Sequence, residues 1–332
     1  MQHSGDSPHD QPHRNRSSPS LVLAGRPAGT TGQQSLARLP GSVHPSAAFG
    51  ESGLPGSKDA FFVQFPHPGG EHHPAGSVMR WNTGGHRRKF LVSPARYLDA
   101  GDTARDGEVV FWGEWEPPSD IIARWEQSGN LPRALHRPFW SRPPADDSRQ
   151  NTDPWVFGDR MILSNCRQAT AGRPNTMQRL TRGSVVCFGS TISGGFCIDT
   201  VMVIASVETW LPAGGADLRA GEAFQFCAAE SLSCGGGRPP ARLTLYRGAT
   251  IEDPVNGMYS FVPSQPSSLP YPRFARPAVQ LPGLIAPGRQ SPQRSRSMPA
   301  DALYDKWETI RRQVLAAGLT PAVWLETPPY RP

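Results

Sequence analysis

The chain has 332 residues, a formal net charge of +6 and a hydrophobic fraction of 37%, with 34 glycines and 36 prolines. Its length allows one sizeable hydrophobic core, whereas the low apolar content predicts a folded centre with disordered ends. No apolar run approaches the ~20 residues that a membrane helix needs, and the first residues lack a signal-peptide pattern. The five cysteines form no CxxC pair, which argues against a zinc ribbon and predicts reduced thiols in a cytoplasmic protein.

The first half of the chain combines a polar tail with two strand candidates. Residues 1–57 are rich in Ser, Gly, Pro and His and predict a disordered tail. An apolar run at 60–65 predicts a short strand that Pro66 ends. GEVVFWGEWEPP (107–118) predicts a buried strand, and SDIIARWEQSG (119–129) predicts a short helix capped by Ser or Asp and ended by Gly.

The middle of the chain holds the strongest strand signal. Residues 131–155 are rich in Pro, Arg and Asp and indicate a loop, and a strand is expected within 155–165. The apolar runs 184–191 and 196–204 flank a Ser-Gly-Gly turn and predict a β-hairpin that is buried on both faces. Further strands are expected at three places, namely 223–227, 242–246 and 257–263.

The last part of the chain begins with residues 287–300, which hold three arginines and no acidic residue and predict a basic linker or exposed loop. Since part of the basic charge lies in this linker, charge alone is a weak argument for nucleic acid. The sequence ADALYDKWETIRRQVLAAG (300–318) predicts an amphipathic helix, and 321–326 predicts a final strand. The apolar stripe of this helix consists of Leu303, Trp307, Ile310 and Val314.

These elements predict an α+β fold with a β-rich core, either a mixed sheet or a small partly open barrel, and a few helices. The expected organisation is a globular domain over 58–286, with the C-terminal helix and strand (301–328) docking on it. No GxGxxG or GxxxxGK[ST] stretch is present, which argues against Rossmann or P-loop nucleotide binding.

The stretch HPGGEHHP (67–74) contains the metal-ligand candidates His67, Glu71 and His72. Imidazole and carboxylate groups suit zinc or iron. The prolines and glycines exclude the regular spacing on a helix or strand that usually aligns ligands. The sequence therefore favours a loop whose His and Glu side chains satisfy backbone groups, with metal binding as the less favoured alternative.

The stretch WNTGGHRRKF (81–90) combines an aromatic residue and an amide with a cationic run, as base-stacking and phosphate-binding surfaces do. The alternative is a solvated hairpin turn with ordinary surface charge. Its candidate ligand-binding residues are Trp81, Asn82, His86, Arg87, Arg88 and Lys89.

Two further stretches offer catalytic candidates. Glu114 and Glu116 in FWGEWE share one face of a continuing strand, and such a pair can do acid–base work or hold a cation; His86 is a further catalytic candidate. The two glutamates could equally form ion pairs with the cations of 87–89. In SNCRQ (164–168), Cys166 is a candidate nucleophile without an identifiable base, and Asn165 and Arg167 are candidate ligand contacts.

Three resemblances to known families follow from these motifs. LYRGAT (245–250) resembles the first motif of ADP-ribosyltransferases and makes Arg247 a ligand-binding candidate, although the ExE pair comes before it. The strand pairs around 180–205 resemble those of PUA-like barrels, the superfamily of modified-base readers and of ASCH and EVE domains. The blocks FVQFPHPGGEH, WNTGGHRRKF, FWGEWEPPS, SNCRQ and GMYSFVP resemble an uncharacterised conserved family related to nucleotide-modification-associated domains.

The leading hypothesis is that the protein binds a nucleotide or nucleic acid through an aromatic and basic pocket. One alternative is an enzyme that uses the His/Glu loop and the paired carboxylates, with or without a metal ion. Another is a non-catalytic interaction protein. The sequence indicates no membrane partner, and it specifies neither a cofactor nor an oligomeric state.

Overall fold

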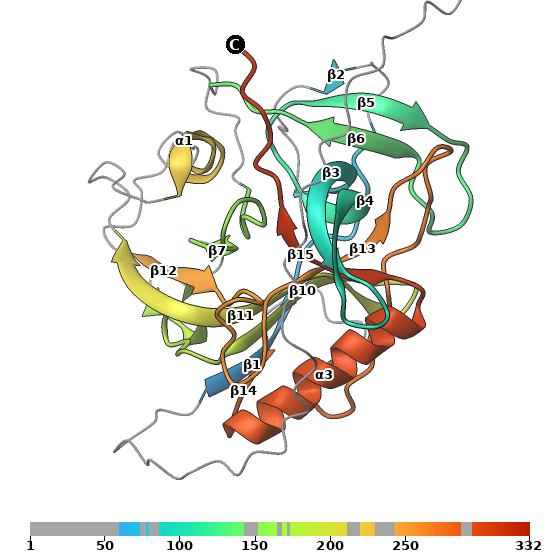
Figure 1. The fold of residues 1–332 in the computed structure, drawn as a ribbon. Coiled ribbons are helices and arrows are strands. Elements are labelled where there is room, and N and C mark those ends of the chain that lie inside the picture. The colour runs from blue at the N-terminus through green and yellow to red at the C-terminus, as the bar shows by residue number, and fades with distance from the viewer. Residues whose placement is uncertain are drawn as a thin grey trace, which may run out of the picture. The chain divides into compact units, whose positions relative to one another are not determined.

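The computed structural model describes residues 60–73, 78–79, 86–142, 152–164, 168–170, 173–210, 220–229, 243–286 and 294–332. All of these belong to one compact unit, Pro55–Pro332. The predicted disordered tail (1–57) and the stretch WNTGG (81–85) lie outside the described residues. The described part is a β-rich α+β fold built on two mixed sheets (Figure 1).

The first sheet contains the predicted hairpin and has the strand order β14-β1-β10-β11-β12-β7. Ser193 and Gly194 in the turn have φ angles of 50° and 80°, the left-handed pair that a tight two-residue hairpin turn requires. The hairpin is therefore confirmed, and β1 extends it as a parallel neighbour of β10. The strand bounds are β1 (Ala60–Pro66), β7 (Ile162–Leu163), β10 (Val185–Ile192), β11 (Gly195–Trp210), β12 (Leu243–Gly248) and β14 (Arg294–Met298).

The second sheet has the order β15-β13-β4-β3-β6-β5-β2, and β15 also pairs with β3. This extra pairing closes β3, β4, β13 and β15 into a ring, which is the part of the fold closest to the expected small barrel. The strand bounds are β2 (Val78–Met79), β3 (Arg88–Leu98), β4 (Ala104–Glu114), β5 (Ser119–Arg124), β6 (Ala134–Pro138), β13 (Val262–Pro266) and β15 (Thr320–Leu325).

The main hydrophobic core lies between the two sheets, because alternate residues of each strand point to opposite faces. On β10, Val186 and Phe188 join the core that also holds Leu91 and Phe111 of the second sheet. Their neighbours Val185 and Cys187 face the other way, toward the C-terminal helix. The hairpin is thus buried on both faces, as its continuous apolar runs predicted.

The C-terminal helix α3 (Ala300–Ala316) lies alongside β1 and β15 in Figure 1. Its predicted stripe residues Leu303, Trp307, Ile310 and Val314 are all buried. The other helical segments are a 3₁₀ turn (η1, Thr176–Gln178), α1 (Gly221–Phe224) and a π-helical turn (η3, Gln225–Ala229). Two short strands, β8 (Ala169–Thr170) and β9 (Arg173–Pro174), form a separate pair. None of the helices in the described ranges is long and apolar enough to cross a membrane.

Several predicted elements were wrong. Residues 119–124 form strand β5 rather than a helix, because their backbone pairs with both β6 and β2. Residues 223–227 are helical rather than extended, and Phe224, Cys227 and Ala228 are buried at helical spacing. The region expected to be a loop at 131–155 contains β6, and the described end of the expected linker at 294–298 forms β14 against β1.

The remaining strand predictions hold to different extents. The strands expected at 60–65, 107–118, 242–246 and 321–326 correspond to β1, β4, β12 and β15, and the one expected within 155–165 is the two-residue β7. The strand expected at 257–263 begins only at Val262. Strand β3 was not predicted, because its charged start resembles a solvated turn.

Candidate functional site

Three of the polar stretches singled out in the sequence meet at the start of β3. The antiparallel register of β3 and β4 places Arg88 opposite Glu114. A bridge between Glu71 and Arg88 brings the His/Glu loop to the same place, and the backbone N–H of His67 donates to the carbonyl oxygen of Gly189. The loop 67–73, the cationic run 86–89 and the carboxylates 114–116 therefore form one cluster.

Arg88 lies at the centre of this cluster and is only 1% exposed. Its Nη1 donates to Glu114 Oε2 at 2.6 Å, and its Nε donates to Asp199 Oδ2 at 2.8 Å. Glu114 and Asp199 are themselves buried, so these charge-assisted hydrogen bonds form away from water. Arg88 consequently joins β4 to β11 through two buried carboxylates.

His86 and Glu116 complete the cluster on the side of Glu114 Oε1. His86 Nδ1 lies 3.0 Å from Glu114 Oε1 and 3.7 Å from Glu116 Oε1, and its side chain is 41% exposed. Hydrogen bonding to Glu114 and the nearby Glu116 carboxylate raise the pKa of His86 to about 10. His86 is therefore the partly exposed side chain that contacts both buried carboxylates.

Glu116 is the least satisfied member of the cluster. It is fully buried, and neither of its carboxylate oxygens has a hydrogen-bond partner among the described residues. Burial raises the pKa of Glu116 because the charged form loses its solvation. A buried carboxylate without hydrogen bonds is costly, so its position calls for a compensating group.

His67 approaches the other oxygen of Glu114. Its Nδ1 lies 3.0 Å from Glu114 Oε2. Neither ring nitrogen, however, has hydrogen-bond geometry to a described partner. The ring is buried between Phe65 and Phe188, with centroid distances of 4.8 Å and 5.7 Å. His67 is thus held by aromatic packing at the edge of the cluster.

Arg88 and Lys89 do not provide the exposed cations that a phosphate-binding surface needs. Arg88 is occupied by two carboxylates, and Lys89 is fully buried with its Nζ donating to the carbonyl oxygen of Pro117 at 3.1 Å. Burial lowers the pKa of Lys89 to about 7. The expectation that these two residues contact a ligand phosphate is corrected, and Arg87 is the exposed cation of this run.

Glu71 and His72 lie beside the cluster and hold the loop in place. Glu71 Oε1 accepts hydrogen bonds from the backbone N–H groups of Arg133 and Ala134, and its Oε2 accepts one from the Arg133 guanidinium. The carbonyl oxygen of His72 lies 3.1 Å from His136 Nε2. Burial lowers the pKa of His72 to about 4. Glu71 therefore satisfies backbone groups, as the favoured prediction for this loop expected.

Arg247 is not part of the cluster. It pairs with Glu208, at 2.9 Å between Nε and Oε1, and lines a cavity of about 470 Å³ to which Arg160 also contributes. None of the residues of the charged cluster lines this cavity. The remaining ligand-binding and catalytic candidates, Trp81, Asn82, Asn165, Cys166 and Arg167, lie outside the described residues.

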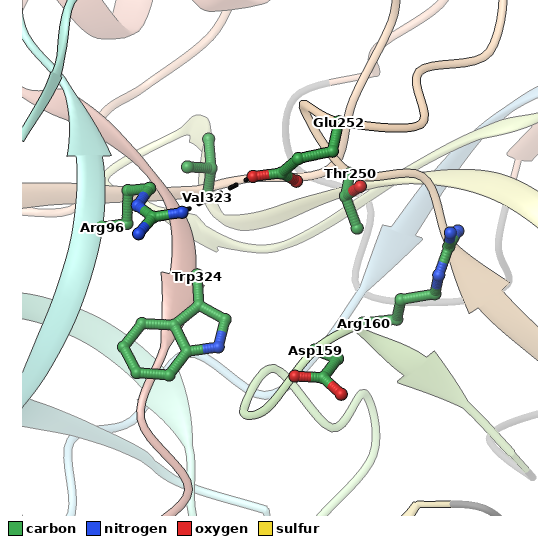
Figure 2. Close-up of a pocket in the computed structure, with 7 residues that line it drawn as sticks. All are labelled: Arg96, Asp159, Arg160, Thr250, Glu252, Val323 and Trp324. Carbon is green, nitrogen blue, oxygen red and sulfur yellow. Dashed lines mark ion pairs between the residues drawn. The ribbon is translucent and has the colours of Figure 1, made fainter. Parts of the chain in front are cut away.

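A neighbouring cavity of about 410 Å³ also includes Arg160 and is drawn in Figure 2. The figure shows the ion pair between Arg96 and Glu252, with the indole of Trp324 beside it. Arg160 pairs with Asp253 at 2.6 Å, so the two arginines of this cavity both have carboxylate partners. Buried polar atoms without a hydrogen-bond partner among the described residues lie instead in the charged cluster, at Glu116, His67 and Asp199.

The cluster has the donor set and spacing of a metal site. One nitrogen of His86 and one oxygen each from Glu114 and Glu116 lie within 4.8 Å of one another. Ligands about 2.1 Å from a tetrahedral Zn²⁺ lie about 3.4 Å apart, close to the 3.0 Å and 3.7 Å found around His86 Nδ1. One nitrogen and two carboxylate oxygens can hold a divalent ion and leave other positions open.

Two members of this cluster were not anticipated. Asp199 lies within the apolar run of β11, and a lone carboxylate in a strand buried on both faces is a signal for a buried partner. Arg276, whose Nε lies 3.8 Å from Asp199 Oδ1, sits in an irregular segment without any such signal. Comparison with family models, curated proteins and solved structures found no match to this chain.

Proposed function

We propose that His86, Glu114 and Glu116 bind a divalent metal ion and that the protein is an enzyme that uses this ion. The observation that carries the proposal is the fully buried Glu116 carboxylate, whose two oxygens lack hydrogen bonds among the described residues. A cation within reach of His86 would compensate this group, because the Glu116 oxygen is only 3.7 Å from the imidazole nitrogen.

The surrounding residues favour this arrangement over a simple ion pair. Arg88 binds Glu114 Oε2, so Glu114 Oε1 faces His86, and Asp199 binds the Nε of the Arg88 guanidinium. A carboxylate fixed in this way has one oxygen committed to orientation and one available to a ligand. A protonated His86 compensates the two carboxylates in part, and a divalent ion would give a stronger form of the same compensation.

The donor set indicates which ions are plausible. An imidazole nitrogen with two carboxylate oxygens suits Zn²⁺, Mn²⁺ or Fe²⁺ better than Ca²⁺ or Mg²⁺, which prefer all-oxygen sites. Bound at the partly exposed edge of the cluster, such an ion would activate a water molecule or polarise a substrate oxygen. We place the substrate on the His86 side, because His86 is the most exposed of the three ligands.

The substrate class that we propose is a nucleotide or nucleic acid, in a protein of cytoplasmic location. Arg87 supports this proposal, since it is exposed, directly follows His86 and can contact a phosphate. The relation to PUA-like and nucleotide-modification-associated proteins remains a prediction from sequence.

Calorimetric titration of protein stripped with EDTA tests the metal proposal. Zn²⁺ and Mn²⁺ should each bind once per chain, and Glu116→Gln and His86→Ala should abolish or greatly weaken this binding. The matched controls are Glu222→Gln, at an exposed glutamate of α1, and His73→Ala, beside Arg133 and outside the ligand set. Equal binding by all four variants, or no binding by the parent protein, would refute the proposal.

A further inference from the structure

A small cavity of about 150 Å³ is lined in part by Arg276. The side chains that matter for its chemistry are Trp112, Gln127, Arg133, Ile192 and Arg276. None of the three proposed metal ligands lines it. The cavity is thus distinct from the metal site, although its lining residue Glu71 belongs to the loop that pairs with Arg88.

Arg276 is a buried cation whose charge is incompletely compensated. Its residue is 7% exposed, and the nearest carboxylate oxygen is Asp199 Oδ1, 3.8 Å from its Nε. That distance is too long for a hydrogen bond, and this oxygen has no hydrogen-bond partner in the described ranges. The close contact of Asp199 is with Arg88, at 2.8 Å between Asp199 Oδ2 and Arg88 Nε. Two buried guanidinium groups therefore compete for one carboxylate.

Neutral partners hold the Arg276 guanidinium in place. Its Nη1 donates to Ser190 Oγ at 3.1 Å, and its Nη2 donates to the carbonyl oxygen of Gly69 at 2.5 Å. The group also lies over the indole of Trp112, with its carbon 4.7 Å from the ring centroid. These contacts fix the orientation of the guanidinium without supplying negative charge, which is how preorganised anion sites are built.

Arg133 provides a second cation at the cavity. It is half-buried, and Glu71 neutralises it at 3.3 Å between Nε and Oε2. Glu71 also lines the cavity, but its oxygens are occupied by Arg133 and two backbone N–H groups. With Arg276 added, the lining carries two positive charges against one negative charge. A cavity of about 150 Å³ has room for a tetrahedral anion.

We propose that this cavity binds a phosphate group, with Arg276 as the principal contact and Arg133 as the second. The phosphate could be free inorganic phosphate or the terminal group of a phosphate monoester, since the guanidinium contacts are the same for both. The site goes beyond the proposed metal-dependent function and does not depend on it.

Calorimetry on the full chain in EDTA tests this site apart from any metal ion, with inorganic phosphate and adenosine monophosphate as the two probes. Gln127→Glu places a carboxylate on an exposed lining residue that already contacts Arg133. It should weaken phosphate binding by about tenfold or more. Gln280→Glu adds the same charge at an exposed position that does not line the cavity, and it should leave binding unchanged.

Arg276→Lys keeps the buried charge but loses the planar contact with Trp112, and it should also weaken binding by about tenfold or more. Because this variant could disturb folding, the exposed Gln127→Glu variant decides the outcome if Arg276→Lys does not fold. Competition between the two probes would identify the monoester as a source, and binding of inorganic phosphate alone would identify the free anion. The proposal is overturned if neither probe binds at millimolar concentration, or if Gln127→Glu and Gln280→Glu bind equally.

Discussion

Replacing Arg88 with methionine is the change that most directly probes the buried cluster. Methionine keeps most of the side-chain volume but removes the charge that Glu114 and Asp199 share, at 2.6 Å and 2.8 Å. Removing one partner of a buried ion pair typically destabilises a protein by about 3–5 kcal/mol, because the other charge stays buried without a partner. Here two carboxylates are affected, but each keeps a second cation nearby, namely His86 for Glu114 and Arg276 for Asp199. We therefore expect a loss of about 4 kcal/mol.

Urea unfolding followed by tryptophan fluorescence would measure this loss in metal-free protein. Arg105→Met is the matched control, because Arg105 also pairs with a carboxylate but is 58% exposed, and such pairs contribute less than about 1 kcal/mol. The Arg88→Met deficit should shrink on acidification, because buried carboxylates that lose their cation have raised pKa values and take up protons in the folded state. An Arg88→Met loss no larger than that of the control would refute the buried ion-pair network.

Three further predictions concern the rest of the fold. Burial lowers the pKa of His136 to about 3, so this histidine should destabilise the fold as the pH drops below the unfolded pKa of 6.5, by about 2 kcal/mol at pH 5. His136→Asn should remove this loss when urea unfolding at pH 5 is compared with unfolding above pH 6.5. A Cβ at Gly189 would overlap the backbone of Cys197, so Gly189→Ala should lower the thermal midpoint clearly, whereas Gly195→Ala, with no contact closer than 3.6 Å, should change it little. Trp307→Ala should cost about 3–5 kcal/mol of unfolding free energy, because this buried side chain packs α3 on the first sheet, and an effect below 1 kcal/mol would contradict that packing.

The fold was predictable where burial and periodicity agree. The hairpin runs are apolar on both faces because β10 and β11 lie between the main core and α3, and the helix stripe is apolar because it covers the same sheet. Residues 119–129 were misassigned because capping residues and an apolar pair suit a helix equally well. Residues 119–124 form a strand because they pair with β6 and β2, and the local sequence does not reveal this pairing.

The candidate site was predictable in its parts and not in its connections. The sequence marked His86, Glu114 and Glu116 as separate catalytic candidates, and the structure brings them together. It also suggested exposed cations at Arg88, whose burial depends on Asp199, 111 residues further along the chain. The ion pair between Arg88 and Glu114 was among the predicted alternatives. The ion pair between Arg88 and Asp199 was missed together with β3, because a charged residue is taken as exposed when its partner is distant in sequence.

The central claim is that a divalent ion binds between His86, Glu114 and Glu116. Anomalous diffraction from a crystal soaked in Mn²⁺ or Zn²⁺ tests it most directly. The predicted result is a peak bonded to His86 Nδ1 and to one oxygen of each glutamate at about 2.0–2.2 Å. A peak elsewhere on the molecule, or none at these three residues in a crystal that diffracts well, would contradict the claim.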